Sequence, residues 1–172
     1  MKTNKKELAE ILGILAVVAS LIFVGMQLHL DRKVARAEQY FNRAESVKED
    51  YRTALLSPEY FRAIEEKWAL TGKTYYSDKG WDEFKNVREG TLNIKSVEAM
   101  ILIDRLQILG YDNLYFQYKQ GLLNETSWNG LRSRLKSTMK ESEMTRDIFQ
   151  RHGRANIQPV INEILKEIEA EQ

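Results

Sequence analysis

The hydropathy pattern is dominated by one apolar stretch near the N-terminus. Residues 8–30 read LAEILGILAVVASLIFVGMQLHL, and positions 11–26 carry no charged side chain. An α-helix rises about 1.5 Å per residue, so a helix over 8–30 covers about 34 Å, enough to cross the roughly 30 Å hydrocarbon core of a bilayer. The pattern therefore predicts a transmembrane helix.

A cleaved signal peptide is the alternative interpretation of this segment. Three lysines precede the apolar stretch, and Ala16 and Ala19 are small residues of the kind found at cleavage sites. Both alanines lie in the middle of the stretch, however, and no small-x-small site follows Met26. These positions favour an uncleaved membrane anchor.

The charges that flank the span bear on its orientation. By the positive-inside rule, Lys and Arg accumulate on the cytoplasmic side of a membrane. The basic residues on the N-terminal side are Lys2, Lys5 and Lys6, and those on the other side are Arg32, Lys33, Arg36 and Arg43. The small excess after the span favours a single-pass protein with a cytoplasmic soluble domain.

Small residues mark one face of the predicted span. Ala9, Gly13, Ala16 and Ser20 follow one another at spacings of four, three and four. This small-residue seam would let two membrane helices approach closely, so it predicts a homo-oligomer or docking to another membrane protein. The alternative is that small residues are common in membrane helices and that the stripe beyond the span packs on the chain's own domain.

Helical periodicity continues past the span. No Gly or Pro occurs between Met26 and Ser57, and apolar residues recur there at helical spacing. We expect the membrane helix to continue to about Leu56, as a rod of roughly 50 residues and about 75 Å. The predicted organisation is an N-terminal tail and transmembrane helix at 1–33, and a helical soluble domain at 34–172 that shares the extended first helix.

Capping signals divide the rest of the chain. Ser57 and Pro58 suit the N-cap and the first position of a helix that Gly72 ends. After a polar connection, a long helix is expected to begin near Lys79. Gly90 lowers the helix propensity of the segment that follows Lys79.

The next stretch, VEAMILIDRLQIL at 97–109, is apolar on nearly every side and should form the most buried helix. Gly110 can bend or end it. Asn124 can cap the following helix, and two shorter helices are expected around 143–152 and 158–170. The predicted fold class is all-α: an N-terminal transmembrane helix continuing into a long helix, packed with about four to five further helices in a small bundle.

Composition narrows the choice of partners. The chain has 26 Lys and Arg against 25 Asp and Glu, a formal net charge of +1. This balance gives no reason to expect nucleic acid or another polyanion as a partner, which leaves the lipid bilayer and other proteins. Cysteine is absent, so disulfides, thiolate metal sites and cysteine nucleophiles are excluded.

No motif for catalysis or for binding a cofactor stands out. The sequence GKT at 72–74 resembles the end of a phosphate-binding loop, but that motif needs a glycine five positions before the first residue, where Lys67 stands. The two histidines, His29 and His152, belong to no metal-binding motif. We therefore expect no catalytic residue, no cofactor and no metal site, and a protein that is not an enzyme.

Charged residues interrupt the predicted central helix. Glu98, Asp104 and Arg105 lie in this otherwise apolar stretch, and burying them costs several kcal/mol unless they are paired. Glu98 and Arg105 are seven positions apart and share a face. Together with Tyr115, these residues predict either a buried ion-pair network that fixes helix register or a polar pocket for a small ligand.

Two segments are distinctive as sequences: YDNLYFQYKQGLLNETSW at 111–128 and AVVASLIFVGMQ at 16–27. They resemble an uncharacterised bacterial family of single-pass, N-terminally membrane-anchored all-helical proteins, whose anchors follow an AVVxSLIxxxxQ-like pattern. The resemblance spans nearly the whole chain and implies a bacterial inner-membrane protein with a cytoplasmic helical domain. In that family the basic residues follow the span, whereas Lys2, Lys5 and Lys6 precede it here.

The sequence thus leads to three functional hypotheses. The first is a non-enzymatic, membrane-anchored helical module that acts by self-association or by docking to a membrane partner. The second is a membrane-tethered sensor of a small ligand, with the polar pocket in its helical domain. The third follows from the family resemblance alone and is a role as an effector component of a stress or phage-defence system.

Overall fold

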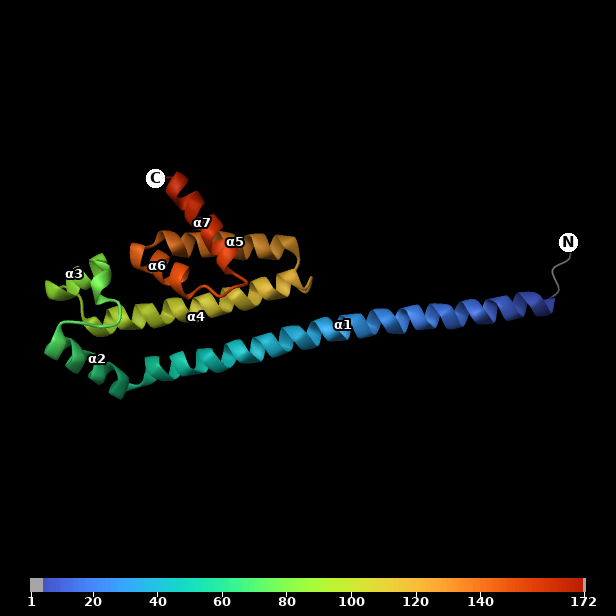
Figure 1. Ribbon diagram of the computed structural model, residues 1–172, viewed down its shortest axis with the longest axis horizontal. Coiled ribbons are helices and arrows are strands. Elements are labelled where there is room, and N and C mark those ends of the chain that lie inside the picture. The colour runs from blue at the N-terminus through green and yellow to red at the C-terminus, as the bar shows by residue number, and fades with distance from the viewer. Residues whose placement is uncertain (1–4, 172) are drawn as a thin grey trace. The chain divides into compact units, whose positions relative to one another are not determined.

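The computed structural model describes residues 5–171 and is all-helical over that range, as predicted (Figure 1). It contains seven α-helices and one short 3-10 helix, and no strand occurs in the described part of the chain. The chain divides into two compact units, Met1–Gln39 and Tyr40–Gln172. Each unit is described by itself.

The first unit consists of the N-terminal part of helix α1, which runs from Lys5 to Leu56 without interruption. This helix is long and apolar enough to cross a membrane, and no residue of its most apolar stretch is buried. Gly13 lies on an open face, where an added Cβ would meet no other atom within 4 Å. The Ser20 hydroxyl donates a hydrogen bond of 2.8 Å to the carbonyl oxygen of Ala16, so this polar group is satisfied within the helix.

The second unit is built around α4, Ile94–Lys119. The other helices of this unit are the C-terminal segment of α1, α2 (Pro58–Thr71), η1 (Ser77–Lys79), α3 (Asp82–Arg88), α5 (Glu125–Lys140), α6 (Glu143–His152) and α7 (Gln158–Ala170). α4 packs against α2, α3, α5 and α6, while α7 packs against α5 and α6. The helix predicted to be most buried is thus the one that most others contact (Figure 1).

Side-chain caps fix where these helices begin. Ser57 Oγ accepts a hydrogen bond of 3.1 Å from the backbone N–H of Tyr60, and Pro58 occupies the first helical turn, as the sequence predicted. Asn124 Oδ1 accepts one of 2.8 Å from Ser127 N–H, which begins α5. Such caps satisfy backbone donors that have no partner within the helix.

The number of helices differs from the prediction, because six α-helices follow α1 instead of four to five. The long helix expected from Lys79 is broken: α3 ends at Arg88, and Gly90 has φ +76°, a left-handed conformation that favours glycine. Asn93 Oδ1 then caps α4 by accepting a hydrogen bond of 2.8 Å from Lys95 N–H. Beyond this point α4 continues straight through Gly110, where the sequence had allowed a bend or an end.

Part of the α1 helix belongs to the second unit and packs against α4 in the antiparallel direction (Figure 1). The ring of Tyr40 stacks on Phe116 at 4.2 Å between centroids. Eleven positions further along α1, the ring of Tyr51 lies 4.6 Å from the guanidinium carbon of Arg105, which is eleven positions earlier on α4. Ala44, which lies between Tyr40 and Tyr51 on α1, is fully buried.

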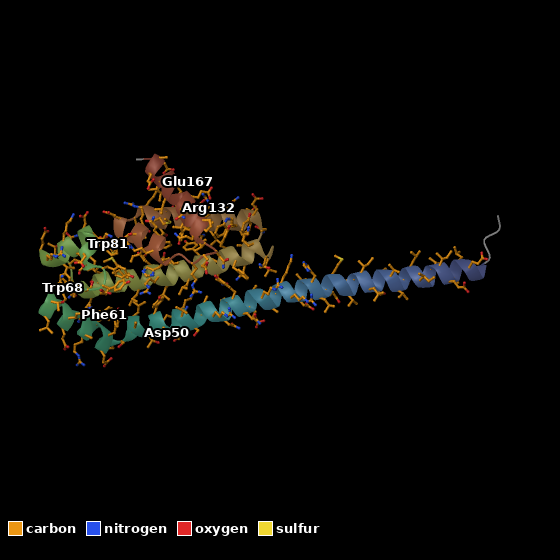
Figure 2. The ribbon with its side chains drawn as sticks, viewed as in Figure 1. Asp50, Phe61, Trp68, Trp81, Arg132 and Glu167 are labelled. Atoms are coloured by element: carbon orange, nitrogen blue, oxygen red, sulfur yellow. The ribbon has the colours of Figure 1, made fainter. Side chains whose placement is uncertain are left out.

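A ladder of ion pairs joins α5 to α7. Arg132 contacts Glu167, and Figure 2 shows these two side chains facing each other. Lys136 lies 2.8 Å from Glu167 and 2.7 Å from Glu171, and Lys140 also pairs with Glu171. Each helix contributes charges at intervals of four residues, so one face of α5 matches one face of α7.

The substitution Glu167→Gln tests how much this ladder contributes. Arg132 and Lys136 lower the pKa of Glu167 from 4.5 to about 2. Its contribution to stability is therefore complete above pH 4.5 and is lost as the pH falls toward 2. The side chain is 34% exposed, so solvent screening limits the expected loss at pH 7 to about 1 kcal/mol.

Urea unfolding of the full chain in a nonionic detergent measures this loss. Tryptophan fluorescence is a suitable signal because all three tryptophans, Trp68, Trp81 and Trp128, lie in the second unit. Glu169→Gln, an exposed change on the same helix, is the matched control. The assignment is contradicted if the Glu167→Gln deficit is as large at pH 3 or in 1 M salt as at pH 7.

Candidate ligand-binding cavity

A cavity of about 290 Å³ lies inside the second unit, between α2, the turn that follows it, α4 and the end of α6. It is lined by Tyr60, Ile64, Lys67, Thr74, Tyr75, Tyr76, Glu98, Ile101, Leu102, Arg105 and His152. Its volume is just below the range of about 300–1,000 Å³ typical of ligand pockets. A small metabolite would fit it better than a large cofactor.

The turn after α2 closes one side of this cavity. Gly72 ends α2 in the left-handed conformation, with φ +61°, and its N–H donates a hydrogen bond of 2.7 Å to the carbonyl oxygen of Trp68. The chain then reverses and brings Thr74 and Tyr76 to the cavity. A residue with a Cβ at position 72 would be strained, which makes this glycine a requirement of the turn.

Glu98 provides the carboxylate of the cavity. The residue is only 6% exposed, and burial raises the pKa of its carboxyl group above the ordinary value. The nearby Thr74 hydroxyl and the charges of Lys67 and Arg105 oppose this rise only in part. Among the described residues, no Lys or Arg nitrogen lies within the 4.0 Å of an ion pair from the Glu98 carboxylate.

Thr74 is a second buried polar group that faces the cavity. It is 8% exposed, and its hydroxyl oxygen has no hydrogen-bond partner. Its backbone is fixed, because the N–H of Thr74 donates a hydrogen bond of 3.1 Å to Ser77 Oγ. An unpartnered buried hydroxyl costs free energy that a ligand or a water molecule can recover by bonding to it.

Arg105 and His152 form the other end of the cavity. The Arg105 guanidinium rests on the ring of Tyr51 and remains half-buried. His152 shares a hydrogen bond between its Nε2 and the hydroxyl of Tyr76. Burial lowers the pKa of His152, and the neighbouring charges of Arg105 and Arg151 lower it further, so this histidine is neutral at pH 7.

The residues predicted to share a polar pocket fall into three places. Glu98 and Arg105 line the same cavity but do not form an ion pair. Asp104 lies beside Thr145 of α6, inside the core. Tyr115 packs on Trp128, with ring centroids 4.8 Å apart, in an aromatic cluster with Tyr118.

Helix geometry explains this separation. Successive residues of an α-helix point about 100° apart, so Asp104 projects well away from its neighbour Arg105. Residues 98 and 105 return to nearly the same direction after two turns. Other polar residues of the cavity, such as Thr74, Tyr76 and His152, come from distant segments, and no spacing in the sequence connects them with Glu98.

Another hollow in the described region is less suited to a small ligand. A groove of about 660 Å³ between α4 and α5, lined by Tyr111, Leu114, Leu131 and Arg134 among others, is larger but more open. In residues 5–171, no group of three or more His, Asp or Glu side chains is placed to hold a metal ion. The cavity is therefore the best candidate for a functional site.

Comparisons with known proteins give no further guidance. No protein family, no curated protein sequence and no solved structure matches the chain. The function must therefore be inferred from the geometry itself.

Asp104→Asn tests whether the Asp104 carboxyl group is desolvated in the folded protein. Burial raises the pKa of Asp104 from 3.8 to about 6, and the Thr145 hydroxyl opposes this rise in part. A raised native pKa means that stability is greatest below pH 3.8 and falls as the pH rises through 6. Relative to Asp104→Asn, the wild type should lose about 2 kcal/mol between pH 4 and pH 7.5.

The comparison uses the same urea unfolding of the full chain in detergent, repeated across this pH range. The quantity of interest is how the difference in unfolding free energy between the two proteins varies with pH. The cost of burying the new amide does not change with pH, so it does not affect this variation. Asp50→Asn, at an exposed position of α1 (Figure 2), controls for the loss of one carboxylate. A difference that stays constant from pH 4 to pH 7.5 would show that Asp104 is not desolvated in the folded protein.

Proposed function

We propose that this protein is a membrane-tethered, non-enzymatic module that binds a small ligand in the cavity around Glu98. The single observation that carries the proposal is that Glu98 and Thr74 are both more than nine-tenths buried and line the same cavity. The carboxylate has no ion-pair partner in the described part of the chain, and apart from the nearby Glu98 carboxylate the Thr74 hydroxyl has no polar partner there. Buried polar groups normally have partners, so a bound molecule would complete this site.

The tether in this proposal is the N-terminal part of α1. Its most apolar stretch is wholly exposed in the structure, and large apolar side chains such as Leu21 and Met26 are more than 60% exposed. Exposed apolar surface on this scale is unfavourable in water and favourable in a bilayer. We place the protein in a bacterial inner membrane as a single-pass protein with a cytoplasmic helical domain, following the flanking charges and the family resemblance.

Arg105 supplies a route by which occupancy could be sensed. Its guanidinium contacts both the cavity and the ring of Tyr51 on α1. A ligand that attracts this guanidinium weakens a cation–π contact worth about 0.5–2 kcal/mol. Binding would thereby change how α1 packs on α4 within the second unit.

A variant that fills the cavity tests the proposal. Ile64 lines the cavity from α2 and is half-buried, so Ile64→Trp should block ligand entry with little damage to the core. The full-length protein in detergent is dialysed against a bacterial metabolite extract, and bound small molecules are measured by mass spectrometry. We expect a compound that is enriched at least tenfold by the wild type and is not enriched by Ile64→Trp.

Leu70→Trp is the matched control, because Leu70 lies on the same helix, is 85% exposed and does not line the cavity. It should capture the compound as the wild type does. If the wild type enriches no compound, or if Ile64→Trp enriches the same ones, the ligand-binding proposal fails.

Self-association through the small-residue seam is a second candidate function. The observation that favours it is a shallow hollow on the first unit, lined by Ala16, Val17, Ser20, Leu21 and Val24. Close helix packing in lipid depends on small residues at such places. The same face would equally serve for docking to another membrane protein.

Mass measurement of the full-length protein in mild detergent tests this second candidate. A wild type that forms a defined oligomer should become monomeric when Gly13→Leu and Ala16→Leu are combined, because the larger side chains keep the helices apart. Val18→Leu with Ile22→Leu, on the opposite face of the helix, should leave the oligomer intact. A strictly monomeric wild type would rule out self-association.

A further inference from the structure

The cavity shows an ordered pattern of chemistry along α4. Glu98, the pair Ile101 and Leu102, and Arg105 occupy three successive turns, and all line the cavity. An acidic group, an apolar wall and a basic group therefore follow one another along one side. The backbone rise between residues 98 and 105 is about 10.5 Å, and no ion pair within 4.0 Å joins the two side chains in the described part of the chain.

The acidic end is equipped to bind a cation that donates hydrogen bonds. The Glu98 carboxylate has no ion-pair partner among the described residues, and the Thr74 hydroxyl beside it can accept a further hydrogen bond. The ring of Tyr60 also lines this region. A primary ammonium group has three donors and one positive charge, which matches these acceptors.

The basic end is equipped to bind an anion. Arg105 can donate to a carboxylate through two parallel hydrogen bonds. Lys67 also lines the cavity, but it is exposed and its charge opposes the rise in the pKa of Glu98 more than that of Arg105 does. His152 is neutral because its pKa is lowered, so the charged groups of the lining are Lys67, Arg105 and Glu98. A simple amine would leave the basic groups unmatched, and a simple acid would leave Glu98 unmatched.

The middle of the cavity is apolar. Ile64 of α2 faces the cavity together with Ile101 and Leu102 of α4. A short methylene chain would remove apolar surface from water there, at about 0.8 kcal/mol per CH₂ group. A ligand that carried its two charges on neighbouring atoms could not reach both ends of the cavity and also fill this part.

We propose that the cavity binds an ω-amino acid: a small zwitterion with an ammonium group at Glu98 and Thr74, a methylene chain along Ile101 and Leu102, and a carboxylate at Arg105. This assignment of ligand class rests on the proposed ligand-binding function. It adds the orientation of the ligand and the reason why the cavity has two oppositely charged ends.

Three probes of equal chain length test the assignment: 6-aminohexanoate, hexanoate and hexylammonium. Each is titrated calorimetrically at pH 7.5 into the full-length protein in a nonionic detergent. We expect 6-aminohexanoate to bind at least tenfold more tightly than either singly charged probe, because each hydrogen-bonded charge contributes a factor of ten or more. Ile64→Trp should abolish this binding.

Charge-removing variants identify the two ends separately. Glu98→Gln should weaken 6-aminohexanoate at least tenfold and leave hexanoate nearly unchanged. Arg105→Gln should weaken 6-aminohexanoate by a similar factor and leave hexylammonium nearly unchanged. Thr74→Val, which removes one hydroxyl at nearly constant volume, should weaken 6-aminohexanoate severalfold, and it serves as the test of the acidic end if Glu98→Gln does not fold.

The matched control is Glu59→Gln, an exposed change on α2 away from the cavity lining. It should bind all three probes as the wild type does. If hexanoate or hexylammonium binds as tightly as 6-aminohexanoate, or if no probe binds, the zwitterion assignment is overturned. The ligand-binding function is judged separately by the metabolite capture with Ile64→Trp, so it can survive this failure or fail independently of it.

Discussion

The burial of three carboxylates on one helix is the constraint on which the second unit depends. Glu98, Asp104 and Asp112 of α4 are each at most 7% exposed, and burial raises the pKa of all three. A carboxylate taken out of water destabilises the fold unless polar groups approach it. Because the three residues project in different directions from α4, a different neighbour must supply polar groups to each, which ties the packing of α1, α2 and α6 to this one helix.

The three carboxylates have different surroundings: two lie in the packed core, and one lines a cavity. Asp112 accepts a hydrogen bond from the hydroxyl of Tyr40, which in turn accepts one of 2.8 Å from Asn156. Asp104 lies against Thr145 in the core, as expected of a group that fixes how α6 sits on α4. Glu98 is the member of this set that lines a cavity. Among the described residues, Asp104 and Asp112 each keep one carboxylate oxygen without a hydrogen-bond partner inside the packed core, whereas Glu98 borders a cavity that a ligand would fill in the proposed function.

The local parts of this structure could be predicted from sequence, and the long-range parts could not. Ser57 and Asn124 cap helices where expected, because a cap depends on only a few neighbouring residues. The early end of α3 at Arg88 was not predicted, although Gly90 had been recognised as a weak point, because Val87 and Leu92 continued the helical pattern past it. Glu98 and Arg105 could be placed on one face by their spacing. Thr74 and His152 could not be assigned to the cavity, since only tertiary packing brings the turn after α2 and the end of α6 to α4.

In the proposed function, the position of Glu98 also links ligand binding to stability. A buried ionised group without a partner is often less stable than an apolar residue of the same size, so a fold selected for stability alone would not favour it. A ligand that supplies the missing partner stabilises the folded state by about 2.7 kcal/mol at 100 times its dissociation constant, an energy of the same order as a desolvation penalty. The occupied cavity is then the better satisfied state of the domain. Because Arg105 is shared between the cavity and Tyr51, binding in the proposed function would reach α1 through one side chain, without a rearrangement of the core.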